Sequence, residues 1–168
     1  MPRARTWPIL VLAGGVLCAV GIIVGWTKVT FTYGEIHREG VGHSTPMGIF
    51  GAALLLIGGF FLARRVTAPR TPADWTAPIG GILVLFSVGL EFVRTYGVEY
   101  IRVEPGPQSA EEVRAQLQEL LATGAAHFDA IWTIGLYMSL VGAIIGLVGA
   151  LLAIRDRPTT VSLAAAPA

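Results

Sequence analysis

The sequence predicts an all-α membrane protein, a four-transmembrane-helix bundle with a small extracytoplasmic β element and one amphipathic helix. The first observation is composition. The chain of 168 residues has a mean hydropathy of +0.66, with 54% hydrophobic and only 14% charged residues, which is too apolar for a soluble domain of this length. The second is that the apolar residues gather in four long blocks, near residues 7–26, 47–63, 77–96 and 131–154. We therefore expect one polytopic domain over 1–168, with outer segments at 27–45 and 97–129.

The first block follows a basic N-terminal stretch, as the apolar part of a secretory signal peptide would. Its apolar run of about 19 residues is longer than the roughly 7 to 15 residues of a signal sequence, and no small-x-small motif closes it. We expect a retained membrane anchor. Cys18 is the only cysteine, so it has no partner for an internal disulfide, and we expect a buried thiol.

The fourth block, residues 131–154, contains no charged side chain. At about 1.5 Å rise per residue it would reach roughly 36 Å, enough to cross a hydrocarbon core of about 30 Å. Small residues recur in this block, and the first block repeats their helical spacing. Because a second helix can come close where side chains are small, we expect these two spans to pack against each other or against a partner helix. The small residues in question are Gly21, Gly25, Ser139, Gly142, Gly146, Gly149 and Ala150.

The first outer segment begins with β-branched and aromatic residues that alternate with polar ones over residues 28–33, which predicts a strand. Glycines then interrupt the pattern. Thr45 and Pro46 predict the start of the second span, because a hydroxyl caps free helical amides and proline fits the first helical position. The connection after that span, residues 66–76, shows no recognisable site.

The second outer segment alternates again over residues 98–104, which we expect to pair with the first strand as a small sheet. Ser109 and Glu112 then form a capping box that predicts a helix, with a stop near Gly124. One face of this helix is apolar and the others are mostly acidic, so we expect it to cover the sheet or dock on a partner rather than lie on anionic lipid. The apolar face consists of Val113, Leu117, Leu120 and Leu121.

The third block holds the only ionisable residues that fall inside an apolar block, Glu91 and Arg94. Three residues apart on a helix, they share a face and can form an ion pair. Because a charge inside a bilayer is costly, one interpretation is a proton or ion relay, or a contact with a buried charge of a partner. The interpretation that we favour is an ion pair at the outer interface, where the helix ends.

Basic residues gather beside one set of span ends, which by the positive-inside rule predicts that this side is cytoplasmic. It carries seven arginines and two aspartates, a net charge of +5, whereas the other side carries five basic and nine acidic residues, a net charge of −4. We expect a multi-pass protein of the bacterial inner (plasma) membrane with both termini cytoplasmic. The overall charge of +1 gives no argument for nucleic acid as a partner, and anionic lipid headgroups account better for the arginines. Those arginines are Arg3, Arg5, Arg64, Arg65, Arg70, Arg155 and Arg157.

Few residues in the sequence suggest a catalytic or metal-binding site. His37, His43 and His127 fall in the outer segments, where a metal site or a pH sensor is one interpretation and solvated or capping roles are the favoured one. Carboxylates near them in sequence are Glu35, Glu39 and Asp129. The sequence contains no Gly-rich phosphate loop, nucleophile elbow, cysteine pair or metalloprotease helix motif, so we expect no catalysis and no cofactor. Four tryptophans near span ends are expected to act as depth anchors at the membrane interface: Trp7, Trp26, Trp75 and Trp132.

The predicted layout places a strand directly after Gly25-Trp26 and a longer outer segment between the third and fourth spans. This layout resembles that of claudin-like four-span proteins, and it is similar to small four-span proteins of unassigned function that are common in actinobacteria. Claudins carry a Trp-rich signature and a cysteine pair in the first loop, whereas Trp26 is the only tryptophan near that loop and the loop has no cysteine. The resemblance implies the layout and carries over no functional residues.

These observations predict a non-catalytic accessory or stabilising subunit of a larger inner-membrane complex, for example a multisubunit lipid importer or a respiratory assembly. It would bind other integral membrane subunits through its glycine-lined helices and its outer β and helix elements. One alternative is a small ion- or proton-coupled transporter that uses Glu91 and Arg94. A second alternative is an extracytoplasmic metal or pH sensor built on the outer histidines.

Overall fold

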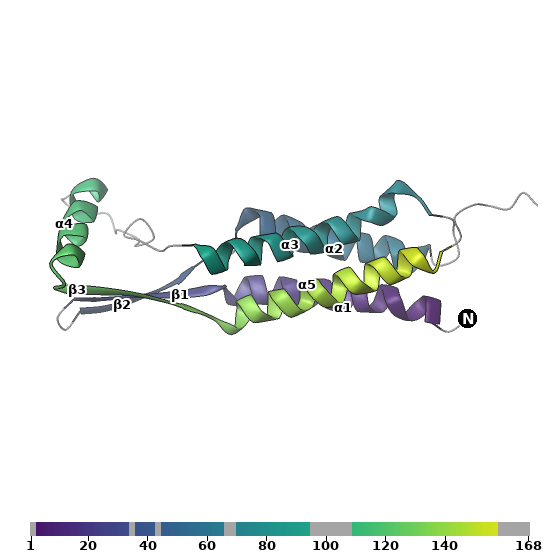
Figure 1. The fold of residues 1–168 in the computed structure, drawn as a ribbon, viewed down its shortest axis with the longest axis horizontal. Helices are drawn as coiled ribbons and strands as arrows, with labels where there is room; N and C mark the ends of the chain where they lie inside the picture. The colour runs from purple at the N-terminus through teal and green to yellow at the C-terminus, as the bar shows by residue number, and fades with distance from the viewer. Residues whose placement is uncertain (1–2, 34–35, 43–44, 66–69, 95–108, 158–168) are drawn as a thin grey trace, which may run out of the picture.

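The computed structural model describes residues 3–33, 36–42, 45–65, 70–94 and 109–157, with the backbone alone for 3–5, 36–42, 110 and 128. Four long helices lie side by side as an elongated bundle, a three-stranded sheet continues from one end of it, and a short helix, α4 (Ala110–Ala122), lies at the tip of the sheet (Figure 1). Each long helix is long and apolar enough to cross a membrane, and each coincides approximately with one of the four predicted spans. The long helices are α1 (Arg3–Val24), α2 (Pro46–Arg64), α3 (Thr76–Val93) and α5 (Ile134–Arg155).

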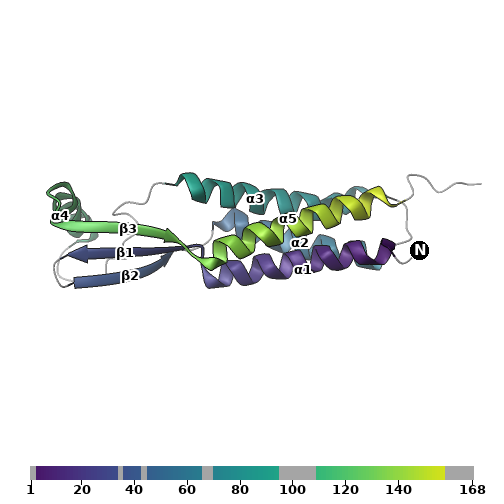
Figure 2. The ribbon, with the colours of Figure 1, turned by 60° about the horizontal axis from the view of Figure 1, so that its bottom comes forward.

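The bundle closes as a ring in which α1 packs on α5 and α2, and α3 packs on α2 and α5 (Figure 2). The contact between α1 and α5 is the most extensive of these. Large aliphatic side chains on the outside of the ring are exposed, as expected for surfaces that face lipid, while the core between the helices is filled. Core side chains with no exposed surface include Val11, Cys18, Leu55, Leu62, Val84 and Leu136.

Glycines bring α1 and α5 into backbone contact. A Cβ atom added at Gly142 would lie 2.6 Å from the Gly14 carbonyl oxygen and 2.9 Å from the Cys18 nitrogen. A Cβ atom added at Gly21 would overlap the Gly135 carbonyl oxygen, and one at Gly149 would lie 3.1 Å from the carbonyl oxygen of Trp7. The small residues of the first and fourth spans therefore face each other inside the chain.

The helix α2 also packs against the glycines of α5. A Cβ atom added at Gly146 would lie 2.7 Å from Cδ2 of Leu55, so the Leu55 side chain fills the space that Gly146 leaves. Ala150, one turn further along α5, is fully buried. Small residues thus allow three helices to meet closely along the inner face of α5.

The sheet has the order β2-β1-β3 and is antiparallel throughout. Its central strand is β1 (Thr27–Tyr33), which confirms the strand predicted over 28–33. Its neighbours are β2 (Ile36–Gly42) and β3 (Ala126–Trp132), neither of which the sequence predicted as a strand. The partner that we predicted for β1, residues 98–104, lies outside the described residues.

Three predicted span boundaries are corrected. Residues 131–132 end β3 instead of beginning the fourth span, because Thr27 pairs with Trp132 and Lys28 with Ile131. The helix starts at Ile134, where the Thr133 hydroxyl accepts a hydrogen bond from the Gly135 nitrogen (3.1 Å). The first span ends at Val24, two residues earlier than expected, so Gly25 lies in the turn after the helix and not on its packing face. The third span ends at Val93, three residues earlier than expected, because Arg94 is extended.

Several helix ends follow the predicted signals. Thr45 caps α2 by accepting a hydrogen bond from the Gly48 nitrogen (3.2 Å). Ser109 and Glu112 form the predicted capping box of α4 (Ala110–Ala122), with distances of 2.8 and 3.2 Å between their side chains and backbone nitrogens. Gly124 follows the helix with a φ of +72°, the left-handed conformation that glycine adopts most readily.

The glycine contacts generate a prediction with a control inside the same protein. Gly142→Leu places a side chain where backbone atoms of α1 lie. We therefore expect the free energy of unfolding to fall by at least about 1–3 kcal/mol. For a chain of this size each kcal/mol lowers the Tm by about 2–4 °C, which circular dichroism of the detergent-solubilised protein can follow. Gly89→Leu is the matched control, because a Cβ atom at Gly89 has no neighbour within 4 Å. An equal loss of Tm in both variants would contradict this packing.

Candidate functional site at the junction of sheet and bundle

The chain passes from helix to strand inside the bundle instead of above it. Gly25 ends α1 with a φ of +89°, which turns the backbone from α1 into β1. The next two residues, Trp26 and Thr27, have no exposed surface. The Thr133 nitrogen donates to the Trp26 carbonyl oxygen (2.9 Å), and the Thr133 hydroxyl donates to the Gly25 carbonyl oxygen. The carbonyl groups of Gly25 and Trp26 thus have hydrogen-bond partners at this buried turn.

Trp26 fastens the start of β1 to two helices. Its indole Nε1 donates to Oγ of Ser139 on α5 (2.9 Å). Its ring lies against Gly48 on α2, where an added Cβ atom would be 2.6 Å from the ring. Ser139 is fixed in turn, because the Cys18 thiol donates to its carbonyl oxygen (3.3 Å) and its hydroxyl donates to the Cys18 carbonyl oxygen (3.4 Å).

This position corrects the prediction that all four tryptophans are depth anchors at the membrane interface. Trp26 is wholly inside the bundle, because its indole N–H has a hydrogen-bond partner there and its ring fills the space beside a glycine. Trp75 is 52% exposed and Trp132 is 46% exposed near helix ends, and for these two the anchor role stays a prediction. Trp7 is half-buried and donates its indole N–H to Asp156 Oδ2 (2.8 Å).

Glu91 fastens the same strand to α3. Its side chain is 1% exposed, and Thr27 Oγ1 donates to its Oε1 (2.6 Å). Arg94 Nη1 lies 3.5 Å from its Oε2, and the Arg94 side chain is 37% exposed at the end of α3. The predicted pair therefore forms, with Glu91 turned inward and Arg94 at the boundary. Sequence reasoning missed Thr27, which lies 64 positions from Glu91 and gives no local signal.

The buried polar groups around Thr27 and Glu91 do not extend as a continuous polar path through the described core of the bundle. Ser87, one turn below Glu91 on α3, is buried, and its hydroxyl has no hydrogen-bond partner among the described residues. Beyond it the described core is apolar, with Leu55, Val84 and Ala143 fully buried. The next buried polar side chain in the described core beyond this stretch is Asp74, at the other end of the bundle. Described buried polar groups thus cluster toward the two ends, and the middle of the described core is apolar.

A second buried polar cluster closes the opposite end. Arg157 Nη1 lies 2.5 Å from Asp74 Oδ1, with both side chains at most 3% exposed, and Arg157 Nη2 donates to the Leu62 carbonyl oxygen of α2 (2.9 Å). Asp74 Oδ2 accepts the Thr71 N–H (2.7 Å), just before the short 3₁₀ helix η1 (Pro72–Trp75). We predicted no site in this connection. The two residues are 83 positions apart, so no local pattern in the sequence indicates the pair.

The outer histidines and α4 are placed only in part. Strand register sets His37 and His127 opposite Thr32 on either side of β1, and His43 lies outside the described residues. The residues whose side chains are described contain no group of three metal-ligating side chains. The α4 helix packs on β3, and its predicted apolar residues are all half-buried: Val113, Leu117, Leu120 and Leu121.

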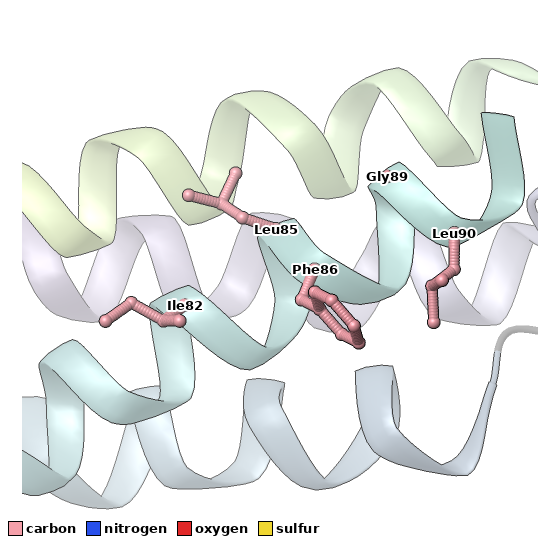
Figure 3. Close-up of a pocket in the computed structure, with 5 residues that line it drawn as sticks. All are labelled: Ile82, Leu85, Phe86, Gly89 and Leu90. Atoms are coloured by element: carbon pink, nitrogen blue, oxygen red, sulfur yellow. The ribbon is translucent and has the colours of Figure 1, made fainter. Parts of the chain in front are cut away.

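A shallow apolar groove of about 500 Å³ runs along the outer face of α3 (Figure 3). Every lining residue belongs to α3, and the groove opens where Gly89 leaves space between larger side chains. It lies on the surface that faces lipid in a membrane and contains no polar side chain that could orient a cofactor. Its lining residues are Ile82, Leu85, Phe86, Gly89 and Leu90.

Comparison with protein-family models finds no match for this chain, and comparison with curated proteins finds no significant match. The resemblance to claudin-like and actinobacterial four-span proteins therefore rests on layout alone.

The Thr27–Glu91 hydrogen bond can be tested with a near-isosteric substitution. Thr27→Val keeps the shape and removes the donor, which leaves a buried carboxylate oxygen without a short hydrogen bond. We expect a loss of about 1–3 kcal/mol in the free energy of unfolding, measured by chemical unfolding in detergent. Thr30→Val, on the same strand and half-buried, is expected to change it by less than about 0.5 kcal/mol. Similar effects of both variants would show that the hydrogen bond to Glu91 does not contribute specifically to the free energy of unfolding.

Proposed function

We propose that this protein is a non-catalytic accessory subunit that stabilises a larger assembly in the bacterial inner membrane. A multisubunit lipid importer and a respiratory complex are examples of such an assembly. The observation that carries the proposal is the burial of Trp26 and Thr27, which fixes the sheet to three helices. An outer element held in one orientation by the bundle is suited to docking, because little freedom is lost on binding.

The closely packed bundle supports a structural role. The described core has no polar line across it, and the groove on α3 opens toward lipid. A closely packed core of this kind suits a scaffold.

The structure changes which surface we propose for docking. Gly142 and Gly146 are occupied by α1 and α2 of the same chain, so they are not available to a partner. The outer element remains, with α4 at its tip and its acidic side chains exposed. We propose that the partner is another integral membrane subunit that contacts this element outside the bilayer. The exposed acidic side chains of α4 are Glu111, Glu112 and Glu119.

We propose that the sheet lies outside the cytoplasm and that both termini are cytoplasmic. The α1 helix begins, and α5 ends, at the end of the bundle opposite the sheet (Figure 1). All seven arginines assigned to the cytoplasmic side belong to or follow helix ends there. By the positive-inside rule, an arginine-rich end of this kind is expected to face the cytoplasm.

A small ion- or proton-coupled transporter is the second candidate, favoured by one observation. The Glu91 side chain is 1% exposed near the end of a predicted span. Burying a carboxylate there costs free energy, and such residues often have a function. Against this stands the apolar middle of the core, which separates Glu91 from the opposite end.

Glu91→Gln separates the two candidates, because it removes the charge and keeps the size and an acceptor for the Thr27 hydroxyl. Under the accessory role, we expect the partner complex to assemble and its transport or respiratory rate to stay within about twofold, since surviving hydrogen bonds hold the fold. Complex content is measured by blue native electrophoresis and the rate in membrane vesicles. Loss of transport with the complex intact would instead identify a carrier.

The docking surface is tested by affinity purification in mild detergent followed by mass spectrometry. Leu117→Asp places a charge on the apolar face of α4, so we expect co-purified membrane subunits to fall by about tenfold or more. Ala73→Asp adds the same charge at an exposed position of η1, at the end of the bundle opposite the sheet, and is expected to leave the yield unchanged. A wild-type protein that purifies as a solitary monomer from native membranes would contradict the accessory role.

A further inference from the structure

The end of the bundle opposite the sheet concentrates positive charge. We call it the arginine end and define it by the described arginines at the ends of α2 and α5 and in the connection between α2 and α3. Only two carboxylates are described there, Asp74 and Asp156, so this set has a net charge of +3. The helix α1 also begins at this end, with Arg3 in its first turn. The defining arginines are Arg64, Arg65, Arg70, Arg155 and Arg157.

Both carboxylates are already engaged. Asp74 is buried against Arg157, so that arginine contributes no open charge. Asp156 accepts a hydrogen bond from Trp7 and lies 3.5 Å from Arg155. Within the described part of the chain, this leaves three exposed arginines without a carboxylate partner: Arg64, Arg65 and Arg70.

Hydrogen bonds hold the Arg70 side chain in place, but they do not neutralise its charge. Its Nη2 donates to the Arg155 carbonyl oxygen (2.9 Å), and its Nε donates to the Arg157 carbonyl oxygen (3.2 Å). These acceptors carry no formal charge, so the guanidinium keeps its full positive charge at the end of α5. Arg157 in turn reaches the Leu62 carbonyl oxygen in the last turns of α2, which ties the end of α5 to the helix that carries Arg64.

An apolar aromatic surface lies directly beside these charges. The guanidinium carbon of Arg64 is 4.4 Å from the centre of the Phe60 ring. Phe60 is 47% exposed and Phe61 is 42% exposed on the outer face of α2, which faces lipid in a membrane. Trp75, 52% exposed, lies at the same end. In a membrane, aromatic side chains near span ends lie at the interface, so a cation beside them lies at the depth of the headgroup phosphates.

We propose that the arginine end binds the headgroup of an anionic phospholipid. Arg64 and Arg65 bind its phosphate, while its acyl chains lie along the outer surface of Phe60 and Phe61. Guanidinium groups suit this ligand because their planar donors match phosphate oxygens in pairs. A soluble anion would match the charge and leave the aromatic surface unused, so the combination points to a lipid.

The test uses the full-length protein in mild detergent, titrated with phosphatidylglycerol or with phosphatidylcholine and followed by native mass spectrometry. We expect tighter binding of phosphatidylglycerol. Each surface arginine contributes about fivefold to anionic-lipid affinity, so Arg64→Gln/Arg65→Gln is expected to weaken it by roughly twenty- to thirtyfold. Arg114→Gln, an exposed arginine on α4 at the opposite end, is expected to change nothing. Circular dichroism verifies folding, and Arg65→Gln alone, with about a fivefold loss, serves if the double variant misfolds.

Three results would overturn the proposal. The first is equal affinity for the neutral and the anionic lipid. The second is a phosphatidylglycerol affinity that the arginine substitutions leave unchanged. The third is inorganic phosphate that binds with the same dependence on Arg64 and Arg65 and displaces the lipid at equal concentration, because the site would then recognise a soluble anion.

Discussion

The insertion of Trp26 and Thr27 into the helix bundle is the constraint on which the rest of the architecture depends. A chain that leaves a membrane helix must satisfy its backbone groups where water is scarce. Here Gly25 turns the chain, Thr133 pairs with the turn, and the first strand starts between the helices. The indole of Trp26 and the hydroxyl of Thr27 then bond to α5 and α3. The sheet is consequently a continuation of the bundle and not a separate loop region.

Close packing of α1 on α5 explains why this continuation is a sheet. The glycines bring the two antiparallel helices into backbone contact, so the chain segments that extend them leave the bundle side by side. One of those segments follows α1 and the other precedes α5, and they pair as β1 and β3 from Thr27 and Trp132 onward. Helix contacts inside the bundle thus set the register of strands outside it. Along the middle of the bundle the described core is apolar.

The elements that rest on local signals could be predicted from the sequence. Hydropathy predicts the four spans, the hydroxyl of Thr45 and the capping box at Ser109 predict two helix starts, and the alternation over 28–33 predicts β1. The predicted pair Glu91–Arg94 also depends on local spacing, and it forms.

What the sequence could not predict depends on tertiary contacts. The apolar residues Ile131 and Trp132 read equally well as the start of a membrane helix, and only their pairing with β1 makes them a strand. The burial of Trp26 depends on the space beside Gly48 and on a hydrogen bond to Ser139, in helices that are distant in sequence. The Asp74–Arg157 pair likewise exists only once α5 has packed against α2.

The most direct test of the central claim is a distance measurement between the sheet and the bundle. Spin labels at Asp129 on β3 and Ala63 on α2, both exposed, can be read by pulsed electron paramagnetic resonance in lipid nanodiscs. Because the sheet is fixed by Trp26 and Thr27, we predict a single narrow distance distribution that broadens in Trp26→Ala. A broad distribution in the otherwise unaltered protein, or one that Trp26→Ala leaves unchanged, would contradict the account.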